Sequence, residues 1–150
     1  MKRAIELAVE NVRLERGGPF GAVIVRDGVI VAEGYNVVTS SCDPTAHAEV
    51  TAIRRACAAL GSFHLGGCEI YTSCEPCPMC LGAIYWAHLD RIYFGCTHTD
   101  AAGAGFDDSA IYQEMRLPLT ARRIPIVGMD RDSAMEAFDA WKVSNERVRY

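Results

Sequence analysis

Residues 1–16 carry apolar side chains at helical spacing. In MKRAIELAVENVRLER, the apolar positions Ile5, Ala8 and Val12 recur three and four residues apart, with charged residues between them. This spacing is typical of an amphipathic helix that buries one face. Gly17 follows the run and predicts where the helix ends.

The pattern then changes to alternating and β-branched runs. PFGAVIVRDGVIVAEGYN contains two such runs, at 20–26 and 29–34, separated by Asp27 and Gly28. An Asp-Gly pair between two β-branched runs is the strongest short signal for a hairpin. We therefore expect two antiparallel strands here.

A second helix is predicted to open at Asp43 and to continue to about Leu60. Asp43 is suited to capping free amides, Pro44 fits the first helical turn, and Gly61 follows the last apolar position. The HAE triplet at residues 47–49 then lies near the N-terminus of this helix.

The rest of the chain alternates strand-like and helix-like segments. Expected strands are at 68–73, 91–96 and 123–129, and expected helices are at 76–89, 109–115 and 131–148. Together with the hairpin these give five strands in a mixed sheet covered by helices, which is a three-layer α/β/α domain. We expect residues 1–150 to form a single domain.

Composition and charge limit the classes of partner. The chain is 50% hydrophobic and 23% charged, which is the profile of a globular protein. Its formal charge of −4 argues against an extended polyanion such as nucleic acid, because such partners need Lys and Arg to neutralise phosphates. A small or neutral ligand fits better.

The first ten residues and the cysteines bear on where in the cell the protein is found. Glu6 and Glu10 interrupt MKRAIELAVE, so it lacks the apolar core of a signal peptide, and the sequence has no apolar run of about 18 residues. We expect a soluble, cytoplasmic protein. Seven cysteines, an odd number, then favour thiols and metal ligands over a disulfide framework.

The segment CEPCPMC, residues 74–80, is the strongest sign of chemistry. Cys77 and Cys80 lie three residues apart on the first turn of a predicted helix, which lets two thiolates bind one zinc ion. A lone His47 at a helix start is more often a cap or a core residue than a ligand. However, H-x-E followed by P-C-x-x-C is the signature of zinc-dependent base deaminases, and this sequence has both parts.

This ligand set predicts a catalytic zinc site. One neutral imidazole, from His47, and two thiolates, from Cys77 and Cys80, leave a fourth position free for water, whose pKa the metal lowers toward neutrality. Glu49 need not bind the metal. It is placed to take the water's proton, pass it to a ring nitrogen and protonate the departing amine.

Three alternatives remain for these residues. The C-x-x-C could be a redox pair, although it lacks the strand and helix context of the thioredoxin type. Cys74 could join the other three ligands in a closed structural site, although Pro76 separates it from Cys77 and such a site has no use for Glu49. A non-catalytic, zinc-stabilised binding module would also use these ligands.

Several further segments resemble a known family. GGPFGAVIV, DPTAHAEVTAIR, YTSCEPCPMCLGAIYWA, HTDAAGAGFDDS and a C-terminal tyrosine are similar to the cytidine deaminase superfamily, and within it to the zinc-dependent bacterial guanine deaminases. The metal motif is shared by the superfamily. GFDDS and Tyr150 are the narrower signals.

The resemblance implies a substrate and its contacts. Guanine would be attacked at C2, with Glu49 shuttling a proton to N3 and then to the leaving amino group, giving xanthine and ammonia. The same resemblance implies the following substrate contacts: Asn36 and Asp108 as polar groups, Phe20 and Trp86 as walls of the ring, and Tyr150 as a lid.

It also implies a homodimer in which the C-terminal segment, from about residue 131 to 150, is exchanged between subunits. Tyr150 of one subunit would then close the other subunit's site.

The substrate contacts each have a structural alternative. Asn36 could hold a left-handed turn at a strand end, and Asp107 or Asp108 could cap the helix near Ser109. Trp86 lies on an apolar helix and would by default belong to the core. We expect the three remaining histidines to be structural or surface residues: His64, His88 and His98.

Two rival substrates remain within the deaminases. A tRNA adenosine deaminase has nearly the same metal motif, although the acidic balance disfavours a polyanion. Guanosine, which differs from guanine by its ribose, is the closer rival.

Overall fold

The computed structural model describes residues 1–149, which divide into two compact units. The first unit ends at Asp108 and the second begins at Ser109. None of the helices in the described residues is long and apolar enough to span a bilayer.

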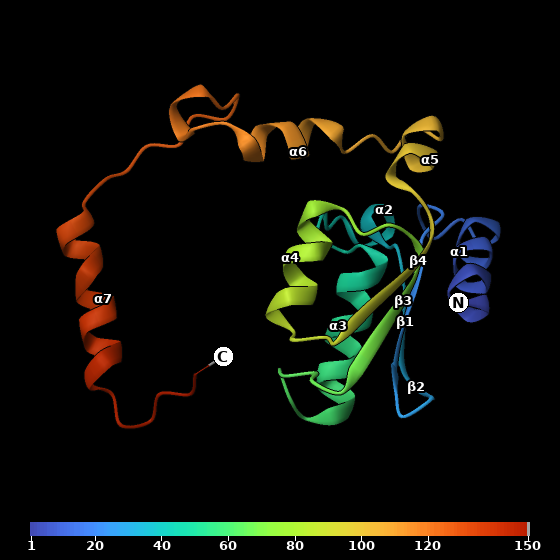
Figure 1. The fold of residues 1–150 in the computed structure, drawn as a ribbon, viewed down its shortest axis with the longest axis horizontal. Helices are drawn as coiled ribbons and strands as arrows, with labels where there is room; N and C mark the ends of the chain where they lie inside the picture. The colour runs from blue at the N-terminus through green and yellow to red at the C-terminus, as the bar shows by residue number, and fades with distance from the viewer. Residues whose placement is uncertain (150) are drawn as a thin grey trace. The chain divides into compact units, whose positions relative to one another are not determined.

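The first unit is built on a four-stranded mixed sheet with the strand order β2-β1-β3-β4 (Figure 1). β1 pairs antiparallel with both β2 and β3, and β3 pairs parallel with β4. The strands are β1 (Gly21–Arg26), β2 (Val29–Tyr35), β3 (Cys68–Cys74) and β4 (Arg91–Cys96). The predicted mixed sheet is therefore confirmed for these four strands.

The β1–β2 hairpin has the predicted turn. Asp27 and Gly28 both have positive φ angles, 52° and 78°. Two consecutive positive φ values are those of a type I′ turn, whose twist matches the flanking strands.

Helices cover both faces of the sheet. α1 (Lys2–Arg13) lies on one face, and α3 (Ala48–Leu60) and α4 (Pro78–Trp86) lie on the other (Figure 1). The core between sheet and helices contains fully buried side chains such as Ile24 and Ile70. Each such side chain contributes roughly 1.5–3 kcal/mol of hydrophobic stabilisation.

Gly34 of β2 lets α3 approach the sheet closely. A Cβ at this position would lie 2.2 Å from the carbonyl oxygen of Ala48 and 2.5 Å from the amide nitrogen of Ala52. Any side chain here would therefore push away the first turn of α3, which is the turn that follows His47.

The start of α3 differs from the prediction. Asp43 does not cap the helix, because its carboxylate accepts hydrogen bonds from the Thr45 amide, at 2.8 Å, and the Thr45 hydroxyl, at 2.7 Å. This local turn satisfies the aspartate before the helix begins, and His47 becomes the N-cap residue. The predicted stop at Gly61 is confirmed, since Gly61 has a φ of 61° at the C-cap.

The predicted fifth strand is not confirmed, because residues 123–129 form no strand in the part of the chain that the structure describes. The apolar side chains of this segment are exposed by 47–78%: Ile124, Ile126, Val127 and Met129. A strand needs a hydrogen-bonding partner, and β4, at the edge of the sheet, pairs only with β3 in the described residues.

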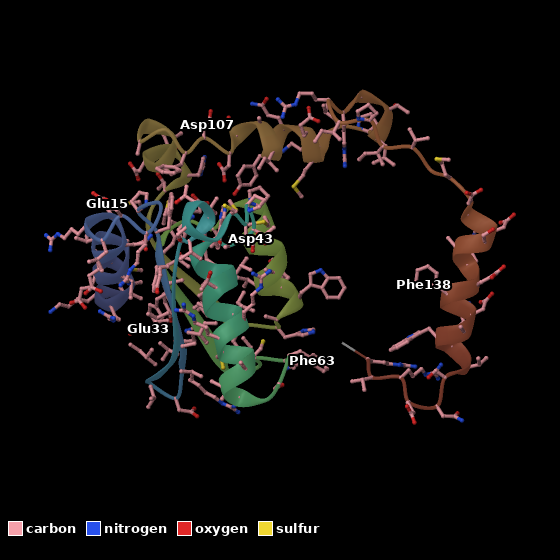
Figure 2. The ribbon with its side chains drawn as sticks, turned by 180° about the vertical axis from the view of Figure 1, so that it is seen from behind. Glu15, Glu33, Asp43, Phe63, Asp107 and Phe138 are labelled. Carbon is pink, nitrogen blue, oxygen red and sulfur yellow. The ribbon has the colours of Figure 1, made fainter. Side chains whose placement is uncertain are left out.

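The second unit contains α6 (Ser109–Arg116), the 3₁₀ turn η1 (Leu119–Ala121) and α7 (Arg131–Val143). Glu114 accepts a hydrogen bond from the Arg123 amide at 2.8 Å. Phe138 projects from α7 and is 61% exposed (Figure 2). Two short helices of the first unit were not predicted: α2 (Val38–Ser41) and α5 (His98–Gly103).

Candidate active site

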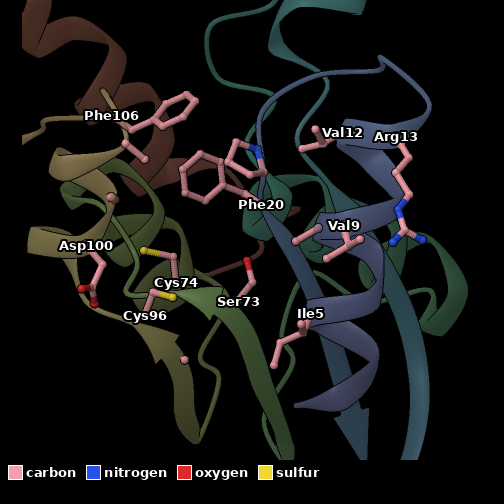
Figure 3. Close-up of a pocket in the computed structure, with 15 residues that line it drawn as sticks. Ile5, Val9, Val12, Arg13, Phe20, Ser73, Cys74, Cys96, Asp100 and Phe106 are labelled. Atoms are coloured by element: carbon pink, nitrogen blue, oxygen red, sulfur yellow. The ribbon is translucent and has the colours of Figure 1, made fainter.

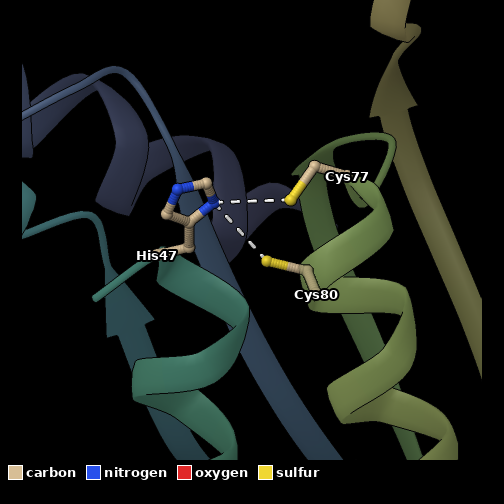
Figure 4. A group of neighbouring side chains, drawn as sticks. All are labelled: His47, Cys77 and Cys80. Atoms are coloured by element: carbon tan, nitrogen blue, oxygen red, sulfur yellow. Dashed lines mark hydrogen bonds between the residues drawn. The ribbon is translucent and has the colours of Figure 1, made fainter. Parts of the chain in front are cut away.

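The predicted ligands lie at the N-termini of two helices. His47 is the N-cap residue of α3, and Cys77 is the N-cap residue of α4, with Cys80 in the first turn of α4 (Figure 4). Both caps have extended backbones, with φ near −65° and ψ of 160° and 167°. The positive ends of the two helices favour thiolate over thiol.

The three donor atoms have the spacing that zinc requires. His47 Nδ1 lies 3.6 Å from Cys77 Sγ and 3.5 Å from Cys80 Sγ. A tetrahedral zinc with nitrogen at about 2.05 Å and sulfur at about 2.3 Å places these ligand atoms roughly 3.6 Å apart. All three donors lie within 4.8 Å of one another. The residues therefore fit zinc as a His/Cys/Cys set.

The pKa values of the two thiols favour binding of a cation. A hydrogen bond from Cys80 and the contact with His47 lower the pKa of Cys77 to about 4. Contact with the Cys77 thiolate, together with burial, raises the pKa of Cys80. The pair therefore holds one negative charge and one proton, and binding of a divalent metal would release that proton.

Glu49 lies beside the ligands but is not one of them. It is the second residue of α3, its side chain is 8% exposed, and it contacts Cys80. Burial, followed by the negative charge of Cys77, raises the pKa of its carboxyl group. A carboxyl group with a raised pKa next to a metal site is suited to exchanging protons near neutral pH.

Asn36 follows the last residue of β2 and is 6% exposed. Its side-chain oxygen, Oδ1, accepts hydrogen bonds from the amides of Gly18, at 3.4 Å, and Val38, at 3.2 Å. Asn36 does not adopt a positive φ angle, so the alternative that it holds a left-handed turn is wrong.

Asp108 and Phe20 lie in the same unit as the ligands. Burial and the negative charge of Cys77 raise the pKa of Asp108, so this carboxyl group interacts electrostatically with the metal-binding pair. Phe20 packs against the Phe106 ring edge to face, with centroids 4.9 Å apart.

The other two predicted substrate contacts are Trp86 and Tyr150. Trp86 ends α4 and is 67% exposed, so the alternative that it belongs to the core is wrong. Its contact with the base remains a prediction. Tyr150 lies outside the described residues.

Cys74 is separate from the metal-binding group. It is the last residue of β3, and its Sγ lies 3.4 Å from the carbonyl oxygen of Thr97, to which it donates a hydrogen bond. The group that can hold a metal contains His47, Cys77 and Cys80, so the closed four-ligand alternative has no support in the described residues.

The sequence did not predict a contact between Glu75 and His98 that the structure shows. Glu75 Oε2 lies 2.8 Å from His98 Nδ1 and accepts a hydrogen bond from the His98 amide at 3.1 Å. It connects the loop that precedes Cys77 to the start of α5. Thr97 and Asp100 form a capping box at this helix start, and the T-x-x-D pattern was the available signal.

An apolar hollow of about 760 Å³ lies beside Phe20, between α1, the ends of β3 and β4, and α5 (Figure 3). Its lining includes Ile5, Val9, Cys74 and Phe106. The metal-binding residues do not belong to its lining as the structure describes it.

Comparison with known proteins places this site in a family context. Residues 1–96 match the model of the cytidine and deoxycytidylate deaminase zinc-binding region. The chain is 58% identical over 150 residues to guanine deaminase of Bacillus subtilis, covering 100% of this chain and 96% of that protein. The X-ray structure of guanine deaminase from that organism superposes with a TM-score of 0.97 at 56% identity, covering 99% and 95% of the two chains.

More distant proteins are similar in structure or in sequence. Guanine deaminase from Nitrosomonas europaea superposes with a TM-score of 0.69 at 29% identity, covering 93% of this chain and 80% of that one. The tRNA-specific adenosine deaminase of Bacillus subtilis is 40% identical over 97 residues, which are 63% of this chain and 58% of that protein.

Proposed function

The chain belongs to the cytidine and deoxycytidylate deaminase family, and from that premise we propose that it hydrolyses guanine to xanthine and ammonia. The observation that carries this proposal is the full-length similarity to a guanine deaminase, combined with a zinc-fitting ligand set beside a buried carboxyl group. A non-catalytic zinc module would not require Glu49 in that position.

The metal-binding residues and Glu49 have different roles in the proposed reaction. His47, Cys77 and Cys80 would hold the zinc, which would supply a water of lowered pKa for attack on carbon. Glu49 would accept a proton from the attacking water and donate it to ring N3. It would then take the second proton from the hydroxyl group left on the carbon and deliver it to the leaving amino group, so that the two protons taken from water equal the two given to the base. Its burial beside the ligands suits this role, because the group must hold each proton between steps.

Recognition of the base is assigned to groups around this centre. Asn36 and Asp108 supply polar contacts, and Phe20 supplies an apolar wall. A site with fixed polar groups rejects a base that leaves them unpaired, since each buried unpaired group costs roughly 1–3 kcal/mol. Trp86 and Tyr150 remain proposed contacts from the family resemblance.

One assay tests the function. Ammonia release is followed with guanine, guanosine, adenine, cytosine, cytidine and an RNA stem-loop that carries adenosine, at equal concentration and with zinc-loaded protein. We expect guanine to be turned over in strong preference to the others. Preference for guanosine would show that the ribose is part of the substrate. Preference for adenosine in an RNA stem-loop would overturn the guanine assignment while leaving the zinc chemistry intact.

We also propose that the protein is a homodimer whose C-terminal segment serves the neighbouring subunit. The second unit exposes large apolar side chains, among them Val127 at 74%, Met129 at 78% and Phe138 at 61%. Soluble monomers rarely expose such a set, and exchange of an identical element between two copies would cover it. A cytoplasmic location is proposed as well, supported by seven free thiols.

A further inference from the structure

Asn11 of α1 is a buried polar residue that the proposed reaction does not use. It is 2% exposed, and its side-chain amide nitrogen donates to two carbonyl oxygens, that of Gly18 at 2.8 Å and that of Asn36 at 2.7 Å. One side chain therefore connects the helix, the turn that follows it and the residue after β2.

Packing alone does not account for an asparagine at this position. Its Oδ1 is buried and has no hydrogen-bond partner among the described residues. A buried unsatisfied carbonyl oxygen is costly, and an apolar side chain of similar size would avoid that cost. The two N–H donors are the distinctive contribution of Asn11.

The backbone around Asn36 is held tightly by the same turn. A Cβ on Gly17 would lie 2.3 Å from the backbone oxygen of Asn36 and 3.1 Å from its Oδ1. The turn at residues 17–18 is thus in direct contact with Asn36, and Asn11 donates to both.

These contacts determine which atom of the Asn36 side-chain amide, Oδ1 or Nδ2, is available to a ligand. Oδ1 accepts from the amides of Gly18 and Val38, and a reversed side chain would place its own N–H groups against these donors. The side chain is therefore oriented with Nδ2 available as a donor. An N–H donor binds a ring nitrogen or carbonyl oxygen of a base and not an exocyclic amino group.

We propose that Asn11 is a positioning residue that acts through Asn36: by holding the Gly18 and Asn36 carbonyls, it fixes the Asn36 side chain so that an N–H donor faces an acceptor of the nucleobase. This inference rests on the proposed function, in which Asn36 contacts the base. Asn11 itself does not touch the substrate.

A double-mutant cycle tests the inference. The value of kcat/KM is measured for the wild type, Asn11→Ala, Asn36→Ala and the double variant, each with zinc content determined. We expect Asn11→Ala to lower kcat/KM for guanine by roughly tenfold or more, with full zinc. In the Asn36→Ala background the same change should cost less than about twofold, because the group it positions is gone.

Two further variants keep the test decisive. Asn11→Leu fills the space with an apolar side chain of similar size and lacks the donors, so it should show the same non-additivity if Asn11→Ala does not fold. Leu7→Ala is the matched control, because Leu7 is 4% exposed on the same helix and packs in the core beside Val23. It should lower the melting temperature without lowering kcat/KM by more than about twofold.

The role of Asn11 can be tested even if guanine is not the substrate. If the wild type does not deaminate guanine, the cycle is measured with whichever base it does deaminate, since the inference concerns the Asn36 donor. If Asn36→Ala is too slow to follow, dissociation constants for xanthine give the same cycle. An equal loss from Asn11→Ala in both backgrounds, or no loss in either, would overturn the positioning assignment.

Discussion

Glu49 has the two properties that a proton carrier in this reaction requires. It contacts the metal-binding group without belonging to it, and burial raises the pKa of its carboxyl group. Both accompany its place in the first turn of α3, where it is 8% exposed and contacts Cys80.

Glu49→Gln therefore separates catalysis from structure. The amide is nearly isosteric but cannot exchange protons, so kcat should fall by at least about 100-fold while zinc content and melting temperature stay close to those of the wild type. Steady-state ammonia release and metal analysis measure the two effects. Turnover near that of the wild type would remove Glu49 from the mechanism and favour a non-catalytic zinc module.

Two cysteines three residues apart test the ligand assignment. Cys77→Ala should lose zinc and lower the melting temperature together, because metal binding and folding are coupled. Cys74→Ala is the matched control: Cys74 donates to Thr97 instead of facing His47, so this variant should retain zinc. The measurement is the zinc content per chain of each variant. Loss of zinc from Cys74→Ala with full zinc in Cys77→Ala would show that Cys74 is the ligand.

The centre of the site could be predicted from the sequence because its chemistry depends on short spacings. H-x-E places His47 at a helix start and Glu49 in the first turn of the same helix, and C-x-x-C places two sulfurs at another helix start. The contact between Glu75 and His98 could not be predicted in this way. It depends on the parallel pairing of β3 and β4, which brings residues 23 positions apart together.

At the scale of elements, the hydrophobic pattern predicted the strands that find a partner. β1 to β4 pair with one another and match the expected segments closely. The segment at 123–129 has the same β-branched character but no partner in the described residues, and so it is not a strand. Local propensity shows that a segment can be extended, whereas pairing depends on what lies beside it.

The start of α5 makes a pH-dependent contribution to stability. The hydrogen bond with Glu75, and then the charges of Asp108 and Asp107, raise the pKa of His98 above its usual 6.5. A raised pKa in the folded state means that this contribution is fully present below the unfolded pKa and is lost as pH rises through the folded pKa.

His98→Gln should accordingly destabilise the protein most at about pH 6 and least at about pH 9. The measurement is the difference in unfolding free energy between wild type and variant, by urea titration with saturating zinc. In a Glu75→Gln background the His98→Gln change should have a smaller and flatter effect. A difference that grows with pH would contradict the assignment of a charged His98.

At the scale of the whole molecule, the two units differ in how much apolar surface they bury. The first unit has a core around Ile24, Leu65 and Ile70, each fully buried. The second unit has no residue that is fully buried among those described, although α7 contains Phe138 and Trp141. Such a segment gains stability only by packing against other surface, and a second copy supplies it in the proposed homodimer.

Removing the last residues tests whether the tail serves its own subunit or its neighbour. Deletion of residues 145–150 should leave zinc bound but sharply lower guanine turnover, because an open site admits water that weakens polar contacts to the base. Glu49→Gln keeps the tail and lacks the proton carrier, so the two variants are inactive for different reasons. Refolding an equal mixture with zinc should form heterodimers as half of the dimers, each with one complete site, which gives about a quarter of wild-type activity. Each variant refolded alone is the control, and a mixture with no regained activity would mean that the tail acts within its own subunit.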